Sequence, residues 1–167
     1  MAMQLQLAAL FCFAALMMVA AFEDLRRLII PNVLTLSLCV LWPFYLVATP
    51  SLFSVLGSLG CALAVFLAGA LLFSRGYLGG GDVKLLAAAA LWAGPTGTPP
   101  LLVLTGVIGG MLALLLLFPP SAHLATLARA KLGPSDAPQR SGLATPVPYG
   151  VAIAAAALIV VFFPHFR

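Results

Sequence analysis

Charged side chains are scarce in this 167-residue chain, which has four acidic and eight basic residues. Hydrophobic residues make up 63% of the sequence, whereas a soluble domain is about half apolar and about a quarter charged. So few charges cannot cover the apolar surface of a soluble domain of this size. The basic residues are also too few and too scattered to follow a phosphate backbone. The composition therefore excludes a soluble enzyme, a disordered tail and a nucleic-acid-binding protein, and it predicts an all-α protein embedded in the lipid bilayer.

Cysteine and histidine are also rare, and neither is grouped. Cys12, Cys39 and Cys61 lie in apolar stretches without a CxxC pair, which is typical of small buried hydrophobic residues rather than of a disulfide or a metal site. His123 and His165 stand alone, and the chain has no H-E-x-x-H sequence. We therefore expect no metal ion and no cofactor.

Long apolar runs dominate the sequence, and Pro- and Gly-rich segments separate them. A membrane-spanning helix needs about 20 mainly apolar residues. Six spanning helices are expected, the fourth being short: 3–22, 33–48, 52–73, 83–93, 101–118 and 147–163. Together they predict one transmembrane helix bundle over residues 1–167, with a polar loop at 119–145. Within that loop, residues 124–131 fit a short interfacial helix as well as they fit a plain loop.

The basic residues predict how this bundle is oriented. Arg26 and Arg27 follow the first apolar run and no Lys or Arg precedes it, which indicates a retained span rather than a cleaved signal peptide. With six spans, all the basic residues except Arg167 fall on one face: Arg26, Arg27, Arg75, Lys84, Arg129, Lys131 and Arg140. Because Lys and Arg are enriched in cytoplasmic loops, this face is predicted to be cytoplasmic and both termini to be outside.

The four acidic residues are Glu23, Asp24, Asp82 and Asp136. A carboxylate close to lipid is costly, so its first interpretation is a functional one. Asp24 ends the first span and Asp82 begins the fourth, so both belong to the cytoplasmic face. Glu23 points about 100° away from Asp24 on a helix, and only one of the two is expected to face a partner. Asp136, between two prolines, is expected in the solvated loop.

Asp82 has unusual neighbours. It follows Gly79, Gly80 and Gly81, which permit positive φ and close backbone approach. Aspartate is also a favoured N-cap, so a tight turn before a capped helix is an alternative interpretation. From Asp82 to Gly94 a helix is about 20 Å long, against about 30 Å of hydrocarbon. We therefore expect either a thinner bilayer there or an Asp82 that lies below the headgroups.

Two aspartates close together cannot both ionise cheaply, and they titrate as a pair. The ionised partner takes a proton from water while the protonated partner polarises a peptide carbonyl. Such a pair hydrolyses an amide without a metal or a covalent intermediate. The sequence favours neither aspartate as the base.

Three stretches of the chain resemble the type IV prepilin peptidases, which are polytopic aspartic proteases of bacterial inner membranes. Asp24-Leu25-Arg26, continuing to Pro31-Asn32, is similar to the first aspartate motif of that family. The stretch 79–86, Gly-Gly-Gly-Asp-Val-Lys-Leu-Leu, is similar to its G-x-G-D motif. The stretch 148–153, Pro-Tyr-Gly-Val-Ala-Ile, resembles its C-terminal signature.

The resemblance implies that Asp24 and Asp82 are the catalytic residues. The residues that support the motifs are Gly79, Gly81, Lys84, Pro31 and Asn32. The implied partner is a prepilin with a short basic leader, cut on the cytoplasmic side after a glycine and before an apolar helix. Because no cysteine-rich segment precedes the first span, the chain is similar to the short form associated with Flp-type, tight-adherence pili, and methylation of the new N-terminus is not expected.

Other interpretations stay open at this point. A G-x-G-D protease of the presenilin or signal-peptide-peptidase type would have a tyrosine-aspartate pair, which Phe22-Glu23-Asp24 lacks. A small proton-coupled transporter or channel predicts carboxylates near the bilayer midplane. An assembly subunit without catalysis would use the glycine turn merely to cap a helix. The sequence indicates neither the pilin nor the oligomeric state.

Overall fold

The computed structural model describes residues 2–46, 52–118 and 147–163 together with Leu127, and in this part of the chain every regular element is a helix. The elements are α1 (Ala2–Arg27), α2 (Asn32–Leu46), α3 (Leu52–Ser74), α4 (Gly80–Leu117) and α6 (Tyr149–Phe162). The expected all-α class is therefore confirmed for the described residues. Residues 124–131 and Asp136, for which a loop or interfacial helix was expected, lie in the segment that is outside the description apart from Leu127.

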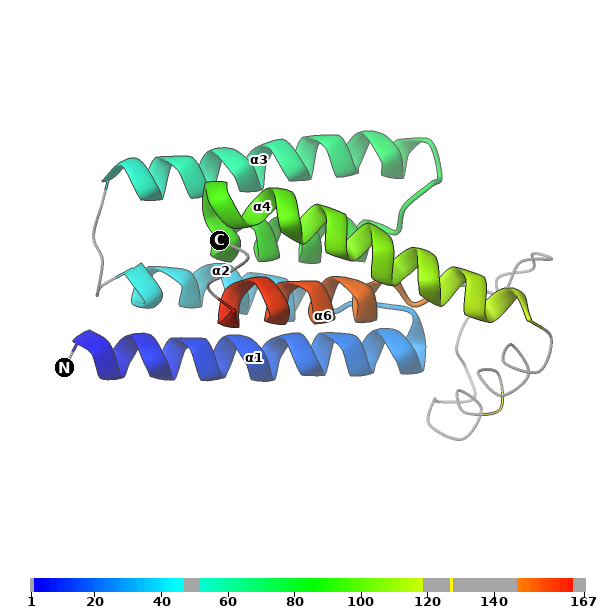
Figure 1. Cartoon of the computed structure of the whole chain (residues 1–167), viewed down its shortest axis with the longest axis horizontal. Coiled ribbons are helices and arrows are strands. Elements are labelled where there is room, and N and C mark those ends of the chain that lie inside the picture. The colour runs from blue at the N-terminus through cyan, green and yellow to red at the C-terminus, as the bar shows by residue number, and fades with distance from the viewer. Residues whose placement is uncertain (1, 47–51, 119–126, 128–146, 164–167) are drawn as a thin grey trace.

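The two predicted segments 83–93 and 101–118 belong to one element, α4, which has a break inside it. The backbone angles of Gly94, φ 69° and ψ −173°, are not helical. Such a positive φ favours glycine. Figure 1 shows that α4 consists of two arms that run in opposite directions along the bundle, so the chain turns back at the break. A break between these two segments was predicted, but it is confined to Gly94, because Pro95, Pro99 and Pro100 are helical.

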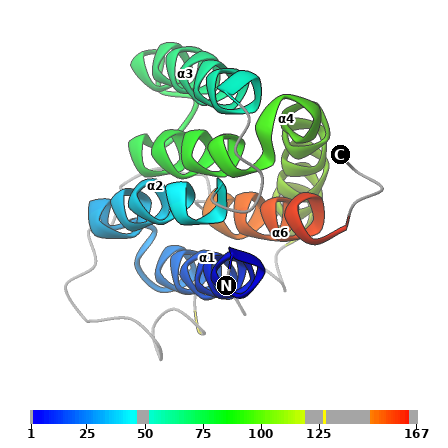
Figure 2. The ribbon, with the colours of Figure 1, turned by 90° about the vertical axis from the view of Figure 1, so that its left-hand side faces the viewer.

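The first arm of α4, residues 80–93, is the centre of the bundle. Its residues from Val83 to Ala93 are nearly all buried, and four consecutive alanines, residues 87–90, allow neighbouring helices to approach closely. Figure 2 shows α3 on one side of this arm and α2 and α6 on the other, with α1 beyond α2 and α6. The sequence placed this short, alanine-rich segment correctly as a helix, but gave no sign that it would be the most enclosed one.

An aromatic cluster ties the first arm to α1 and α2. The Trp92 ring stacks on Phe13 with 4.5 Å between ring centroids, and Tyr45 lies 5.3 Å away on the α2 side. The indole N–H donates to the Leu38 carbonyl oxygen at 3.0 Å. A buried indole N–H needs such an acceptor, so this contact satisfies a polar group in the interior of the bundle.

The outside of the bundle is apolar. Large hydrophobic side chains are exposed along α1, α2, α3 and the second arm of α4, among them Phe11, Val40, Leu63 and Met111. A soluble monomer rarely exposes apolar surface on this scale. By length and hydropathy, α1, α3 and α4 include segments able to cross a membrane, while α2 and α6 are shorter apolar helices. The cysteines are free, but Cys12 and Cys39 are exposed on this surface, so their predicted burial is wrong.

Glycine contacts on α3 provide a test of this packing. A Cβ atom added at Gly57 would lie 2.6 Å from Cγ of Pro95, whereas one added at Gly60 would meet nothing within 4 Å. We expect Gly57→Ala to lower the free energy of unfolding by about 1–3 kcal/mol because the proline ring cannot yield. Gly60→Ala, on the same helix, is expected to be neutral or stabilising by up to about 1 kcal/mol. Unfolding of both variants in detergent checks this, and equal stability would contradict the packing of α3 on α4.

Candidate active site

The end of α1 places Asp24 inside the protein. Arg26 and Arg27 occupy the last turn, where cations interact favourably with the helix dipole. Leu28 then adopts a left-handed φ of 53°, and its N–H donates to the Asp24 carbonyl oxygen at 2.9 Å, which closes the helix. Asp24 itself is 5% exposed. Its Oδ2 accepts a hydrogen bond of 2.7 Å from the backbone N–H of Gly150, at the beginning of α6.

Asp82 lies in the first turn of α4. The N-cap is Gly79, with φ −74° and ψ 142°, so the alternative interpretation of Asp82 as the N-cap is wrong. Asp82 is the third residue of the helix, where an acidic side chain interacts favourably with the positive end of the helix dipole. The carboxylate folds back over Gly79, because a Cβ atom added there would lie 2.6 Å from its Oδ2.

The glycines before Asp82 serve close contact rather than unusual backbone angles. The glycines with positive φ are Gly76 and Gly94, so the 79–81 stretch uses ordinary φ values. A Cβ atom added at Gly81 would lie 3.1 Å from the Cβ of Ile30, in the segment that joins α1 to α2. Of the two properties expected from this stretch, close approach is confirmed and positive φ is not found.

Two further contacts involve residues of the first motif. Lys84 Nζ donates to Oδ1 of Asn32 at 2.9 Å, which joins residues 52 positions apart. The Pro31 carbonyl oxygen accepts the N–H of Leu34 at 3.1 Å in the first turn of α2. Asn32, Gly81 and Lys84 therefore connect the Asp24 segment to the Asp82 segment. We call this end of the bundle, with Asp24, Asp82 and Gly150, the site end; it lies to the right in Figure 1.

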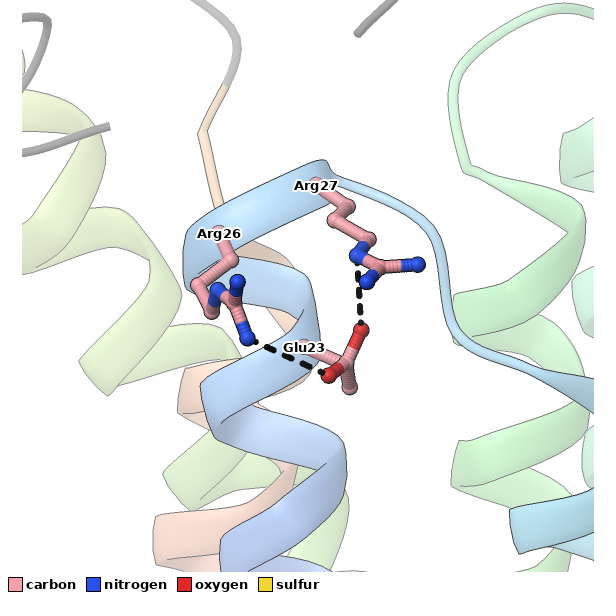
Figure 3. A network of polar contacts seen from close by, with 3 residues as sticks. All are labelled: Glu23, Arg26 and Arg27. Carbon is pink, nitrogen blue, oxygen red and sulfur yellow. Dashed lines mark ion pairs between the residues drawn. The ribbon is translucent and has the colours of Figure 1, made fainter. Parts of the chain in front are cut away.

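Glu23 faces a different set of partners from Asp24. Its carboxylate lies 3.2 Å from Nε of Arg27 and 3.9 Å from Nη1 of Arg26. Figure 3 shows both guanidinium groups beside Glu23 on the last turns of α1. Arg26 also lies over the Phe22 ring, 5.2 Å from its centroid. Neighbouring carboxylates on α1 thus have separate partners, as the helix geometry predicted.

A groove opens beside the site end between α2, α3 and α4. It has a volume of about 470 Å³ and mainly apolar walls, with Asn32, Thr35 and Lys84 as polar residues near the site. From Lys84 to Leu91 it follows α4 for about 10 Å, or two helical turns. We call it the membrane groove. Its lining residues are Asn32, Val33, Thr35, Leu36, Cys39, Ala62, Phe66, Lys84, Ala87, Ala88 and Leu91.

Comparison with known proteins identifies the family. The family model described as the type IV leader peptidase family matches residues 11–114. This is more than half of the chain. The chain belongs to the type IV leader peptidase family. No curated protein and no solved structure shows a significant match. Membership indicates a peptidase, and it agrees with the resemblance seen in the motifs.

The matched region contains Asp24 and Asp82 but ends before α6. The structure nevertheless brings α6 onto Asp24 through Gly150. The sequence singled out residues 148–153 as a signature, with packing near the site or entry into a helix as alternative roles for Pro148 and Tyr149, and with no role for Gly150. The signal available was a glycine at the beginning of an apolar helix, which does not by itself say what approaches it.

The contact between Asn32 and Lys84 is testable by a double-mutant cycle. Asn32→Ala and Lys84→Ala each remove one partner, so the double variant should be less destabilised than the sum of the two, by about 0.5–1 kcal/mol for an exposed pair. Unfolding in detergent measures the coupling. Arg75→Ala is the control, because Arg75 is another exposed cation after α3, and it should be additive with Asn32→Ala. Additivity in both cycles would contradict the contact.

Proposed function

We propose that this chain is a membrane aspartic endopeptidase that removes the leader from prepilin-like precursors, with Asp24 and Asp82 as its catalytic pair. The observation that carries the proposal is the meeting of the two motifs at the site end. Ile30 contacts Gly81, and Asn32 accepts from Lys84. These contacts put the end of α1 beside the beginning of α4, and each of these turns carries one aspartate. Membership of a leader peptidase family supplies the reaction class.

The chemistry follows from two carboxyl groups that share a proton. The ionised carboxylate takes a proton from a water molecule, which attacks the peptide carbonyl, while the protonated partner donates a hydrogen bond to the carbonyl oxygen. The amine of the leaving segment then receives a proton as the tetrahedral intermediate breaks down. Because the two groups titrate together, base and acid roles are assigned to the pair rather than to one residue.

We further propose that the site end faces the cytoplasm. Arg26, Arg27, Arg75 and Lys84 all belong to the turns at this end, and Lys and Arg are enriched on the cytoplasmic side. The proposal includes six spans, counting the two arms of α4 separately, with both termini outside. The protein would then be a multi-pass protein of the bacterial inner membrane.

The apolar walls of the membrane groove suit a substrate that has an apolar segment. The groove lies in the apolar part of the bundle and reaches the site end at Asn32 and Lys84. A substrate bound at the aspartates would continue into it for about two helical turns. We propose that the residues that follow the cleaved bond lie there as a helix, while the leader stays at the polar end.

Asparagine substitutions test the catalytic pair. Asp24→Asn and Asp82→Asn keep the size of the side chain but remove the proton exchange, so each is expected to lower the rate of precursor cleavage by about 100-fold or more. Conversion of purified precursor in detergent or liposomes, followed on a gel, measures this.

Glu23→Gln is the matched control, because Glu23 adjoins Asp24 but pairs with the arginines. It should cleave at a rate close to wild type. Normal cleavage by Asp24→Asn or Asp82→Asn would defeat the proposal. An assembly subunit would show a silent Asp82→Asn, since asparagine also suits the beginning of a helix.

Filling the membrane groove tests the place of the substrate. Ala62 lines the groove on α3, and Ala62→Phe is expected to raise KM for the precursor several-fold because the ring occupies the space of the substrate helix. Ala64→Phe, on the same helix but not among the lining residues, should leave KM unchanged. Steady-state kinetics on the full precursor measure both. An unchanged KM in Ala62→Phe, with the protein folded, would contradict binding in this groove.

A further inference from the structure

We infer that Gly150 positions the Asp24 carboxylate for catalysis, through its backbone N–H and through the absence of a side chain. The inference rests on the proposed function, because it assigns a role toward a residue of the proposed pair. Gly150 lies beyond the matched family region and belongs to α6, which is otherwise an apolar helix. It is a positioning residue, since it acts through Asp24.

A hydrogen bond joins Gly150 to Asp24. Gly150 N–H donates to Asp24 Oδ2 at 2.7 Å, and both groups are buried. This distance is at the short end of the range for N–H···O hydrogen bonds. With Oδ2 held in place, the rotation of the carboxyl group is fixed, and its second oxygen has one orientation. A group that exchanges a proton with water in a defined geometry requires such a restraint.

The packing of Gly150 against Asp24 leaves no space for a side chain at position 150. A Cβ atom added at Gly150 would lie 2.8 Å from Oδ2 of Asp24, 2.9 Å from its Cβ and 2.9 Å from its Cγ. The conflict is not with the far end of a flexible side chain, because the Cβ of Asp24 is fixed by the backbone of α1. Any side chain at position 150 must therefore displace α1, α6 or the carboxyl group.

Asp24 also lies at the N-terminal end of α6. The N–H groups in the first turn of a helix lack partners within the helix. The N-cap residue, Pro148, makes no capping hydrogen bond with its side chain. The Asp24 carboxylate, although it belongs to α1, therefore accepts a hydrogen bond from the first turn of α6, as the side chain of an N-cap residue would. This contact gives the N–H group an acceptor and the carboxylate a donor.

Packing against the other helices holds α6 in place. Tyr149 packs against the second arm of α4, because a Cβ atom added at Gly109 would lie 2.9 Å from Cε1 of Tyr149. Farther along, α6 is buried among the other helices by its alanine-rich face, including Ala152, Ala156 and Ala157. The N–H of Gly150 is thus presented by a fixed helix.

Two changes distinguish the effect of the Gly150 hydrogen bond from the effect of the missing side chain. Gly150→Ala keeps the N–H but adds the colliding Cβ. Replacing the Tyr149–Gly150 amide by an ester, through incorporation of glycolic acid at position 150 in cell-free synthesis, removes the N–H and adds no atom. Each is expected to lower kcat for precursor cleavage about 10- to 100-fold while KM stays within about twofold, because substrate contacts are untouched.

Matched glycine variants serve as controls. Gly110→Ala meets nothing within 4 Å and should keep wild-type kinetics. Gly109→Ala presses on Tyr149 rather than on Asp24, so it reports a general disturbance of α6. If Gly109→Ala lowers kcat as much as Gly150→Ala at equal loss of stability, packing of α6 explains the effect and positioning is overturned.

A double-mutant cycle on stability tests the contact without relying on activity. In the Asp24→Gly background the Oδ2, Cγ and Cβ atoms that collide are all gone, so Gly150→Ala should be much less destabilising there than in the wild type. Equal destabilisation in both backgrounds would contradict the contact.

The outcomes also separate this inference from the proposed function. Full activity of Asp24→Asn defeats the catalytic pair. An inactive Asp24→Asn combined with wild-type kcat in both Gly150→Ala and the ester variant leaves the pair intact and overturns the positioning role alone.

Discussion

A buried carboxylate in an apolar bundle must find its polar partners within the chain, because neither lipid nor alanine side chains replace water. Asp24 is in this position at the end of α1, and the N–H of Gly150 meets it there. The requirement works in both directions, since the beginning of α6 also needs an acceptor. One hydrogen bond thus links the first helix of the chain to the last described one, and the arrangement of the site end depends on it.

Close approach of backbones makes this link possible. Glycine occupies the points where α4 and α6 approach the segments with the two aspartates: Gly79 beneath the Asp82 carboxylate, Gly81 against Ile30, and Gly150 against Asp24. None of the three uses a positive φ. Their contribution is space rather than backbone freedom, and a methyl group at any of them would press on an atom of the site segments or on their connection.

Much of this architecture follows from local sequence, and some of it does not. Apolar runs and breakers predicted the helices, and the 100° step between Glu23 and Asp24 predicted that they would have different partners. The helical Pro95 is tolerated because it is the first residue after the turn at Gly94, where a helix needs no N–H donor. Pro99 and Pro100 lie beyond the first turn of this arm, and the local sequence does not explain their helical conformation. The role of Gly150 escaped prediction because it depends on a residue that is 126 positions away and on a third helix that fixes α6.

Helix lengths relate the site to the bilayer. Two short segments, the first arm of α4 and α6, both begin at the site end and are each about 21 Å long, against about 30 Å of hydrocarbon. In the proposed arrangement, in which both segments cross the bilayer, the difference has to be met by thinning of the bilayer or by a recess at one end of the bundle. The site end carries Asp24, Asp82, Asn32 and Lys84, which are costly to bury in lipid, so a recess there is the less expensive solution. Such a recess would let water reach the proposed catalytic pair, Asp24 and Asp82, beside an apolar groove, which is the combination that the proposed hydrolysis next to a membrane helix requires.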